Sequence, residues 1–224
     1  MARFSRLQVL NTMHNIGIIP LFYHSDVNKA RDVIKACYAG GARVIEFYNR
    51  GDRAWNVFNE LLPMVEQEMN GLILGIGSVV DPATAAMYIS SGANFVVSPV
   101  LVPEIARLCN RRKIAYLPGC GSASEISQAE EMGCEFIKLF PANCLGGPEF
   151  IKAIKGPMPW TSIVPTGGVK ATKENISEWV KAGAVCVGMG GDLLGSEIIK
   201  AGDYQAIQKK VENCLGWYKE ARGQ

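Results

Sequence analysis

Short apolar stretches alternate with longer segments of mixed polarity along almost the whole chain. The apolar stretches are predicted to be β-strands, and the segments between them helices. The predicted strands are residues 16–22, 43–47, 72–76, 94–97, 114–117, 135–141, 162–164 and 184–187. The predicted helices are residues 26–39, 53–68, a helix opening at 81, 102–110, a helix opening at 122, 148–154, 172–181 and 204–219. A separate amphipathic helix is predicted over residues 4–14, with Phe4, Leu7, Val9 and Leu10 on one side.

Three of the predicted helices begin with residues that helix starts prefer. Asp81 stands before Pro82, which combines an N-cap residue with a first-turn proline. Ser122 and Glu125 have the spacing of a capping box. Asp203 is placed to cap the last helix.

The order of these elements predicts the fold class. Strands that alternate with helices imply an α/β protein with parallel strands. Eight such units without an intervening linker imply a closed (β/α)₈ TIM barrel, here with a short N-terminal helix. We therefore expect residues 1–224 to form a single barrel domain. The alternative is an open, doubly wound sheet, but the Gly-x-Gly-x-x-Gly of a dinucleotide-binding fold does not follow the first strand.

The predicted strand at 135–141 carries a lysine among aromatic residues. Alternation along the strand places Phe136, Lys138 and Phe140 on one face. Lysine is rarely buried without a partner, and loss of hydration favours its neutral amine, a nucleophile that can condense with a carbonyl. The alternative is that the stem of the side chain lies along apolar surface and its ammonium reaches water.

Polar residues and glycines follow several strands at their carboxyl ends, where barrel enzymes carry their active sites. Val44, Glu46 and Tyr48 share one face of the second strand, so Glu46 is expected to point inward, with Arg50 just beyond it. The residues at the other strand ends are Ser78, Pro99, Thr166, Gly167, Gly168, Gly190 and Gly191.

Each of these residues also has a purely structural explanation. Glu46 is also explained by an ion pair with Arg43, Arg50 or Lys138, because buried charges are usually paired. Arg50 fits a solvated loop, and Ser78 fits a cap for the next helix. The glycines fit tight turns, or they offer backbone N–H groups to a phosphate.

The composition narrows the function classes. The 224 residues are 48% hydrophobic and 20% charged, and a formal charge of +2 without a basic run gives no reason to expect nucleic acid as a partner. Seven cysteines without a Cys-x-x-Cys pair favour free thiols in a reducing compartment.

His14 and His24 are isolated, so no metal site is expected. No apolar run reaches the ~18 residues of a membrane span, and no secretory signal is recognised, so we expect a cytoplasmic protein with no membrane partner.

An inward lysine, an inward glutamate and a nearby arginine together predict a reaction. The amine of Lys138 attacks a ketone to give a Schiff base, while Glu46 moves protons at the carbinolamine oxygen and at a substrate hydroxyl. Arg50 holds a carboxylate beside the ketone with bidentate geometry. This is the chemistry of a lysine-dependent aldolase that acts on a small keto acid, without a cofactor beyond the covalent Schiff base.

The segment 133–146, Gly-Cys-Glu-Phe-Ile-Lys-Leu-Phe-Pro-Ala-Asn-Cys-Leu-Gly, resembles the active-site pattern of a known family. It is similar to that of the 2-keto-3-deoxy-6-phosphogluconate / 2-keto-4-hydroxyglutarate aldolases, which are class I enzymes on a (β/α)₈ barrel. The resemblance extends over about residues 18–194. It implies that Lys138 forms the Schiff base, that Glu46 is the catalytic glutamate, and that Arg50 binds the carboxylate of pyruvate.

The resemblance also implies the remaining parts of the site. The residues expected to bind substrate are Arg50, Ser78, Pro99, Phe140, Thr166, Gly167, Gly168, Gly190 and Gly191. Phe140 is expected to be a wall of the apolar pocket. The reaction implied is cleavage of a 2-keto-3-deoxy or 2-keto-4-hydroxy acid to pyruvate plus an aldehyde, and the implied assembly is a homotrimer.

The chain departs from the family pattern at three positions. Tyr48 stands where the family usually has threonine, and its larger ring is expected to narrow the pocket. Ser78 also replaces a threonine but keeps the hydroxyl. Asp192 follows Gly191, where phosphate-binding members tend to have serine. Its carboxylate is expected to cap the short helix that follows and to repel a phosphate there.

Two other functions are compatible with a barrel. One is a phosphosugar isomerase or epimerase that uses Lys138 and Glu46 as acid and base. That enzyme needs firm phosphate binding, against which Asp192 argues. The other is a catalytically inactive barrel that binds a keto acid, against which the complete set of lysine, glutamate and arginine argues.

Overall fold

Parallel strands alternate with helices throughout the computed structural model, which describes residues 2–223. The strands are β1 (Ile18–Phe22), β2 (Val44–Tyr48), β3 (Ile73–Gly77), β4 (Phe95–Val97), β5 (Ala115–Leu117), β6 (Gly119–Cys120), β7 (Phe136–Leu139), β8 (Ser162–Pro165) and β9 (Val187–Met189). The helices are α1 (Arg6–Ile16), α2 (Val27–Ala39), α3 (Ala54–Glu68), α4 (Pro82–Ser91), α5 (Pro103–Arg112), α6 (Ala123–Glu131), α7 (Pro148–Lys155), α8 (Lys173–Ala182), α9 (Ser196–Ala201) and α10 (Tyr204–Ala221), with a 3-10 turn η1 (Ala142–Leu145). The predicted alternation of strands and helices is confirmed.

The strands are arranged in two parallel sheets that curl around one interior. Six strands pair in the order β5-β4-β3-β2-β1-β9, and three pair in the order β6-β7-β8. The uninterrupted ladder that a closed barrel predicts is not formed among residues 2–223. One reason is Pro118, which has no N–H to donate and separates β5 from β6. The order from β1 to β5 follows the chain without the reversal of a doubly wound sheet, so the doubly wound alternative is wrong, although the six-stranded sheet is itself open.

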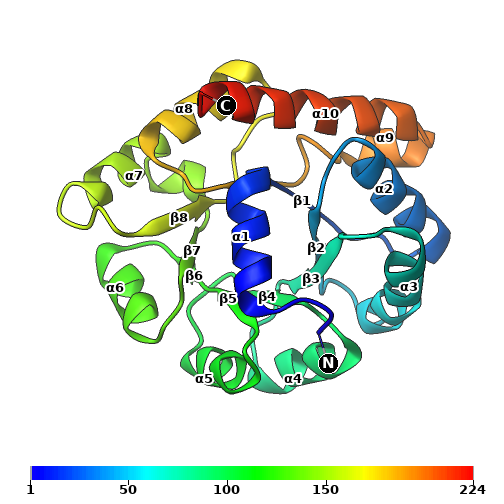
Figure 1. Ribbon diagram of the computed structural model, residues 1–224, viewed down its shortest axis with the longest axis horizontal. Helices are drawn as coiled ribbons and strands as arrows, with labels where there is room; N and C mark the ends of the chain where they lie inside the picture. The colour runs from blue at the N-terminus through cyan, green and yellow to red at the C-terminus, as the bar shows by residue number, and fades with distance from the viewer. Residues whose placement is uncertain (1, 224) are drawn as a thin grey trace.

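The interior enclosed by the strands is filled from both sheets and from α1. Figure 1 shows α1 lying across the middle of the ring of strands, inside a circle of helices. Val9, Leu10 and Met13 of α1 are buried in the same apolar cluster as strand residues of both sheets. Leu7 was predicted to share this face and is instead 71% exposed, because the buried stripe of the helix runs through positions 9, 10 and 13.

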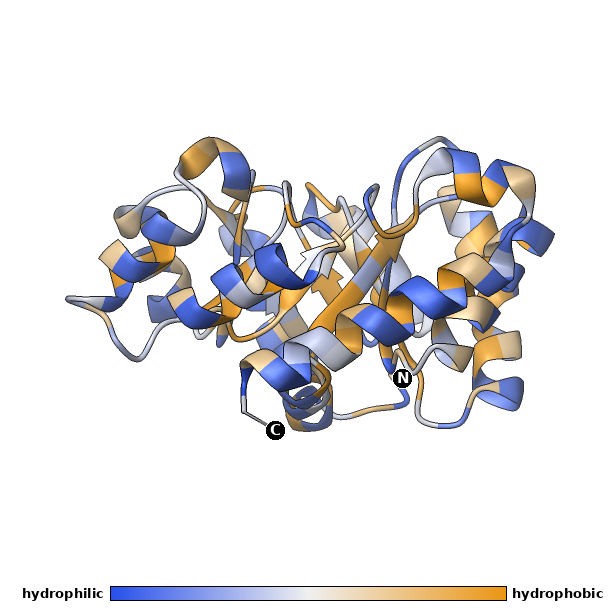
Figure 2. Ribbon diagram, turned by 90° about the horizontal axis from the view of Figure 1, so that it is seen from above, coloured by the Kyte–Doolittle hydropathy of each residue, from blue (hydrophilic) through white to orange (hydrophobic). Residues whose placement is uncertain are grey.

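The side chains of β2 point alternately into the interior and toward the surrounding helices, so they contribute to two separate apolar clusters. Val44 and Tyr48 contact the interior cluster, whereas Ile45 and Phe47 belong to the cluster between the strands and the surrounding helices. Glu46, between them, therefore faces the interior, as predicted. Figure 2 shows mainly apolar colouring on the central strands and mixed polar and apolar colouring along the helices around them.

The three predicted helix caps are confirmed. The side chain of Asp81 accepts a hydrogen bond from the backbone N–H of Thr84, and Ser122 and Asp203 accept the equivalent bonds of α6 and α10. The last strand begins at Val187, three residues after the predicted start at 184. No helix within residues 2–223 combines the length and the apolar character needed to span a bilayer.

Candidate active site

Lys138 and Glu46 face each other in the interior, Lys138 one residue before the end of β7 and Glu46 at the middle of β2. Lys138 is 6% exposed and Glu46 3% exposed. The Nζ atom of Lys138 lies 3.9 Å from Oε1 of Glu46 and 5.0 Å from the centroid of the Phe140 ring. Both residues line a cavity of about 10 Å³ together with Thr166 and apolar residues of the strands. The sequence prediction that Lys138 and Glu46 point inward is confirmed, and the alternative in which the ammonium reaches water is wrong.

The carboxylate of Glu46 is incompletely bonded. Its Oε1 is a buried atom without a hydrogen-bond partner among residues 2–223. Burial raises the pKa of Glu46, and the nearby charges of Lys138 and Arg50 oppose that rise without cancelling it. A buried polar atom that lacks a partner calls for a functional explanation. Glu46 therefore has the environment of a group that takes up and releases protons.

The raised pKa of Glu46 predicts how the free energy of unfolding changes with pH. Because the folded state holds the proton of Glu46 more tightly than the unfolded state, stability is lost as the pH rises from the ordinary value of 4.5 through the raised value. Relative to Glu46→Gln, the wild type should lose stability over this window, with a slope of at most about 1.4 kcal/mol per pH unit. Denaturant unfolding of both proteins at several pH values measures this, and a pH-independent difference would contradict it.

Two glycines make room for the polar side chains of the interior. A Cβ atom on Gly77 would lie 1.7 Å from Oε1 of Glu46, and one on Gly188 would lie 2.5 Å from Oγ1 of Thr166. The sequence patterns had not predicted a role for either of these glycines. The available signal is a glycine within an otherwise apolar strand, at the end of β3 for Gly77 and at the middle of β9 for Gly188, which often marks a close approach of another group.

Arg50 is held by two contacts at the end of β2. Its Nε donates a hydrogen bond of 3.3 Å to Oγ of Ser78, and its guanidinium carbon lies 4.1 Å from the centroid of the Tyr48 ring. Ser78 has a φ of 60°, in the left-handed region that non-glycine residues rarely adopt. Burial raises the pKa of Tyr48, and Glu46 adds to that rise. The structure thus brings Ser78 and Arg50 together, as the sequence predicts, and adds Tyr48 as the platform under the guanidinium.

Loss of the Tyr48 ring should weaken the hold on Arg50. Tyr48→Leu removes the cation–π contact, which is typically worth about 0.5–2 kcal/mol, so KM for a keto acid is expected to rise about 2- to 30-fold while kcat changes less. Tyr48→Phe keeps the ring and serves as the matched control. Steady-state kinetics of the wild type and both variants test this: an equal rise in KM for both variants would show that the hydroxyl matters and the ring does not, and an unchanged KM in both would contradict the role of Tyr48.

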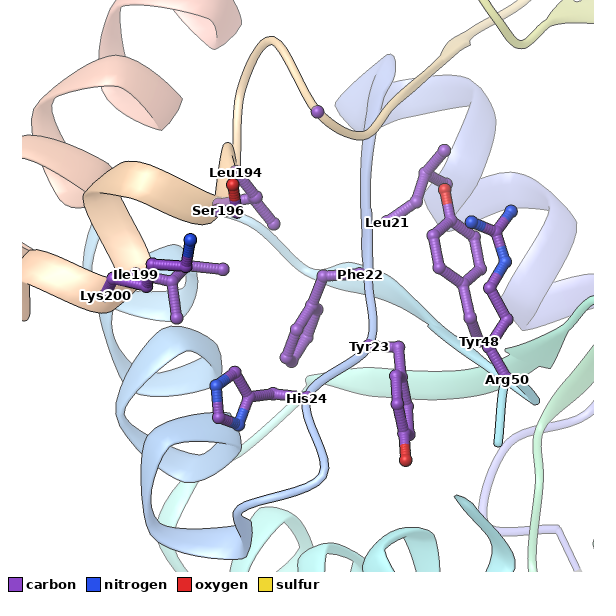
Figure 3. Close-up of a pocket in the computed structure, with 11 residues that line it drawn as sticks. Leu21, Phe22, Tyr23, His24, Tyr48, Arg50, Leu194, Ser196, Ile199 and Lys200 are labelled. Atoms are coloured by element: carbon purple, nitrogen blue, oxygen red, sulfur yellow. The ribbon is translucent and has the colours of Figure 1, made fainter. Parts of the chain in front are cut away.

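A larger cavity of about 340 Å³ opens beside the Lys138 centre (Figure 3). Its lining residues come from the ends of β1 and β2 and from the segment after β9: Leu21, Phe22, Tyr23, His24, Tyr48, Arg50, Gly191, Leu194, Ser196, Ile199 and Lys200. Leu21 also lines the small cavity at Lys138, so the two cavities share a wall. Tyr23, His24 and Lys200 were not predicted as site residues, although two of them directly follow the first strand.

The glycines and the proline that were predicted to bind substrate lie in different parts of the molecule. Gly191 lines the larger cavity, and a Cβ on Gly190 would lie 3.1 Å from the hydroxyl of Tyr48. Gly167 and Gly168 both have positive φ values and lie against Asn143 of η1. The main chain of Pro99 packs against Gly119. Substrate binding by these residues stays a prediction.

The expectation that Asp192 caps the short helix α9 is wrong. The N-cap of α9 is Gly195, and no side chain caps this helix. The carboxylate of Asp192 instead accepts a hydrogen bond from the backbone N–H of Ala171, in the loop after β8. A turn in which the N–H groups of residues 193 and 194 both bond to the carbonyl of Gly190 directs Asp192 toward that loop. The predicted repulsion of a phosphate had been argued from that cap, and it stays a prediction.

Other reactive groups lie apart from this centre. Within residues 2–223 no group of three or more His, Cys, Asp or Glu side chains is arranged to hold a metal ion. The seven cysteines are free, and only Cys144 is exposed. Burial raises the pKa of Cys109 and of Cys134 to about 12, which leaves both as inert thiols at neutral pH.

Comparison with known proteins agrees with this geometry. Among curated proteins, a 2-dehydro-3-deoxy-phosphogluconate aldolase from Pseudoalteromonas atlantica is 33% identical over 198 residues, covering 88% of this chain and 89% of that protein. The aldolase of the same name from Pseudomonas aeruginosa is 34% identical and covers 92% of this chain and 90% of that protein. A crystal structure of KDPG aldolase from Legionella pneumophila, with pyruvate captured as a covalent carbinolamine intermediate, has a TM-score of 0.83, 27% identity, and coverage of 91% of this chain and 96% of that one.

The family match covers nearly the whole described chain. Residues 9–210 match the family described as KDPG and KHG aldolase, so the match includes every strand and the two residues of the interior pair. The relatives are aldolases, which cleave or form a carbon–carbon bond. The chain belongs to the KDPG and KHG aldolase family and is an enzyme of the carbon–carbon lyase type.

Proposed function

We propose that the protein is a class I aldolase that works through a Schiff base on Lys138. Its substrate is a 2-keto-3-deoxy sugar acid, with or without a 6-phosphate, or 2-keto-4-hydroxyglutarate, and its products are pyruvate and an aldehyde. The observation that carries the proposal is the pair in the interior: a buried lysine amine 3.9 Å from a buried carboxylate oxygen that has no other partner among residues 2–223. The Legionella relative that holds pyruvate as a carbinolamine supports it.

The positions of these two groups suit the steps of the reaction. The amine of Lys138 adds to the ketone carbon, and Glu46 gives a proton to the carbinolamine oxygen so that water leaves and an iminium forms. The resulting carboxylate of Glu46 then takes the proton of the C4 hydroxyl. The C3–C4 bond breaks, its electron pair moves into the iminium, and the aldehyde departs. A proton returned to the enamine carbon and hydrolysis of the iminium release pyruvate and free Lys138.

The surrounding residues have supporting roles in this proposal. Arg50 and Ser78, already bonded to each other, bind the carboxylate next to the ketone. The ring of Phe140 covers one side of the amine and limits its hydration. Thr166 lines the same small cavity and is placed to contact the substrate beyond its ketone.

Trapping with borohydride tests the mechanism. Incubation of the wild type with pyruvate and sodium borohydride should add the mass of a reduced pyruvyl group, located by peptide mapping on Lys138. Lys138→Ala should form no adduct and should have no measurable turnover. An adduct of equal yield in Lys138→Ala would refute the proposed mechanism, and an adduct in a protein that cleaves no keto acid would identify a binding protein instead of an aldolase.

We propose further that the two sheets act as the wall of one closed barrel domain. Backbone bonds cross both junctions between the sheets: the N–H of Lys138 bonds to the carbonyl of Pro118 at 3.0 Å, and the N–H of Val185 bonds to the carbonyl of Ile163 at 2.9 Å. Thr166 and Gly188 form a parallel bridge at the second junction. A single barrel domain should unfold in one cooperative transition with coincident fluorescence and circular dichroism curves.

A homotrimer is the assembly that we propose. Large apolar side chains are exposed on neighbouring elements: Val80 is 58% exposed, Met87 39% and Val100 52%. Trp55, 39% exposed, donates a hydrogen bond to Ser91 and so lies beside α4. Apolar side chains that cluster at the surface commonly mark an interface between proteins. Light scattering coupled to size exclusion should give three times the chain mass, and Met87→Asp should lower it.

A further inference from the structure

The charged side chains that line the larger cavity are all cationic. Among its described lining residues, Arg50 and Lys200 are cationic and none is a carboxylate. Figure 3 shows Arg50 and Tyr48 on one side, Lys200, Ile199 and His24 on the other, and Phe22 between them. Phe22, Leu194 and Ile199 supply apolar surface between the two cationic ends. Such a cavity favours a ligand that is anionic at both ends.

The hydrogen bonds of His24 orient its ring. The backbone N–H of Asp26 donates to Nδ1 of His24 at 3.0 Å. Because Nδ1 accepts this bond, the hydrogen of the neutral ring is on Nε2. His24 also lines the cavity, so its Nε2–H is a donor available to a ligand there.

Lys200 is available to a ligand as well. Its Nζ lies 3.1 Å from Oε1 of Glu197 one turn earlier on α9, but both side chains of this pair are exposed. Exposed pairs of this kind contribute little stability, so an anionic ligand can replace Glu197 as the partner of the ammonium. Lys200 and His24 come from different segments and reach the same end of the cavity, opposite Arg50.

We propose that His24 and Lys200 bind an anionic group at the end of the substrate distant from its ketone. The inference rests on the proposed function: if Arg50 holds the first carboxylate and Lys138 the ketone carbon, the remaining carbons extend past Leu21, which lines both cavities, toward Lys200. The glycine turns after β8 and β9 had been predicted to hold the distal end. Gly167 and Gly168 do not line the cavity, whereas Gly191 lines it together with His24 and Lys200, and these two side chains are the charged or ring donors at that end. Phosphate and carboxylate are the two anions that fit these donors.

The experiment compares Lys200→Met with a matched control, Lys209→Met. Lys200 and Lys209 are both exposed lysines paired with a glutamate three residues away, but Lys209 is on α10 and does not line the cavity. KM is measured for 2-keto-3-deoxy acids that end in phosphate, in carboxylate or in a neutral hydroxymethyl group. Lys200→Met and His24→Leu should each raise KM about 10- to 100-fold for at least one anionic substrate and leave the neutral one unaffected. Lys200→Arg should restore most of the loss, and Lys209→Met should cause none.

The outcomes separate this inference from the proposed function. The anionic substrate with the larger rise in KM identifies the preferred group. Unchanged KM values in both Lys200→Met and His24→Leu, or an equal rise for the neutral substrate, would overturn the inference while pyruvate trapping in the wild type still supports the aldolase. If trapping fails, titration calorimetry with inorganic phosphate tests the cavity on its own. Binding that weakens in Lys200→Met but not in Lys209→Met supports the site, and equal binding by all three proteins overturns it.

Discussion

Glu46→Gln is expected to lower kcat by about 10²- to 10⁴-fold, the range that a positioned general acid or base contributes, while pyruvate can still be trapped on Lys138. Glutamine has nearly the size of glutamate, so it fits the space beside Gly77. It cannot give a proton to the carbinolamine oxygen or take one from the C4 hydroxyl. The amine of Lys138 remains, and adduct formation with pyruvate at high concentration should continue slowly. The measurement is kcat by pyruvate release, beside the yield of reduced adduct.

Glu125→Gln provides the control for this variant. Glu125 is a carboxylate outside the active site that accepts hydrogen bonds from the N–H of Gly121 and the hydroxyl of Ser122 at the start of α6. Its replacement should lower stability slightly and leave kcat unchanged. Equal kcat values for wild type and Glu46→Gln would remove Glu46 from the proton-transfer steps. A loss of both turnover and trapping would show that formation of the Schiff base requires Glu46, against the slow trapping expected here.

The position of Glu46 was predictable because strand alternation is a strong constraint. Along β2, the apolar residues at 45 and 47 pack outward under helices, which leaves position 46 no direction but inward. The same argument placed Lys138 on the inner face of β7. Local capping rules also sufficed at Asp81, where the side chain needs only the N–H of Thr84 three residues later.

The features that were missed depend on contacts between distant parts of the chain. The break between β5 and β6 arises at Pro118, but only pairing with β7 shows where the ladder resumes. Asp192 stands three residues before the true N-cap of α9 and bonds to Ala171, a partner that no local rule selects. His24 and Lys200 are 176 positions apart in the sequence, and only the curling of the strands brings β1 and α9 to one cavity.

Gly77→Ala is the second substitution for which we expect a large effect. The added Cβ would lie 1.7 Å from Oε1 and 2.5 Å from the carboxyl carbon of Glu46. Either the carboxylate leaves its position facing Lys138 or β2 and β3 separate, and the second change would disturb the ladder in which Tyr48 pairs with Gly77. Overpacking of this kind typically costs about 1–3 kcal/mol. We therefore expect a loss of kcat comparable to that of Glu46→Gln, together with reduced stability.

A double-mutant cycle can assign the effect of Gly77→Ala to this contact. In a Glu46→Ala background the carboxylate is gone, so the stability cost of Gly77→Ala should fall by about 1 kcal/mol or more, a coupling typical of residues in direct contact. Gly216→Ala is the control, because its Cβ meets nothing within 4 Å and lies inside α10, where alanine should stabilise the helix by about 0.5–1 kcal/mol. Denaturant unfolding of the wild type and the four variants gives the cycle and its control. An additive cycle would show that Gly77→Ala destabilises the protein through the backbone of β3 and not through contact with Glu46.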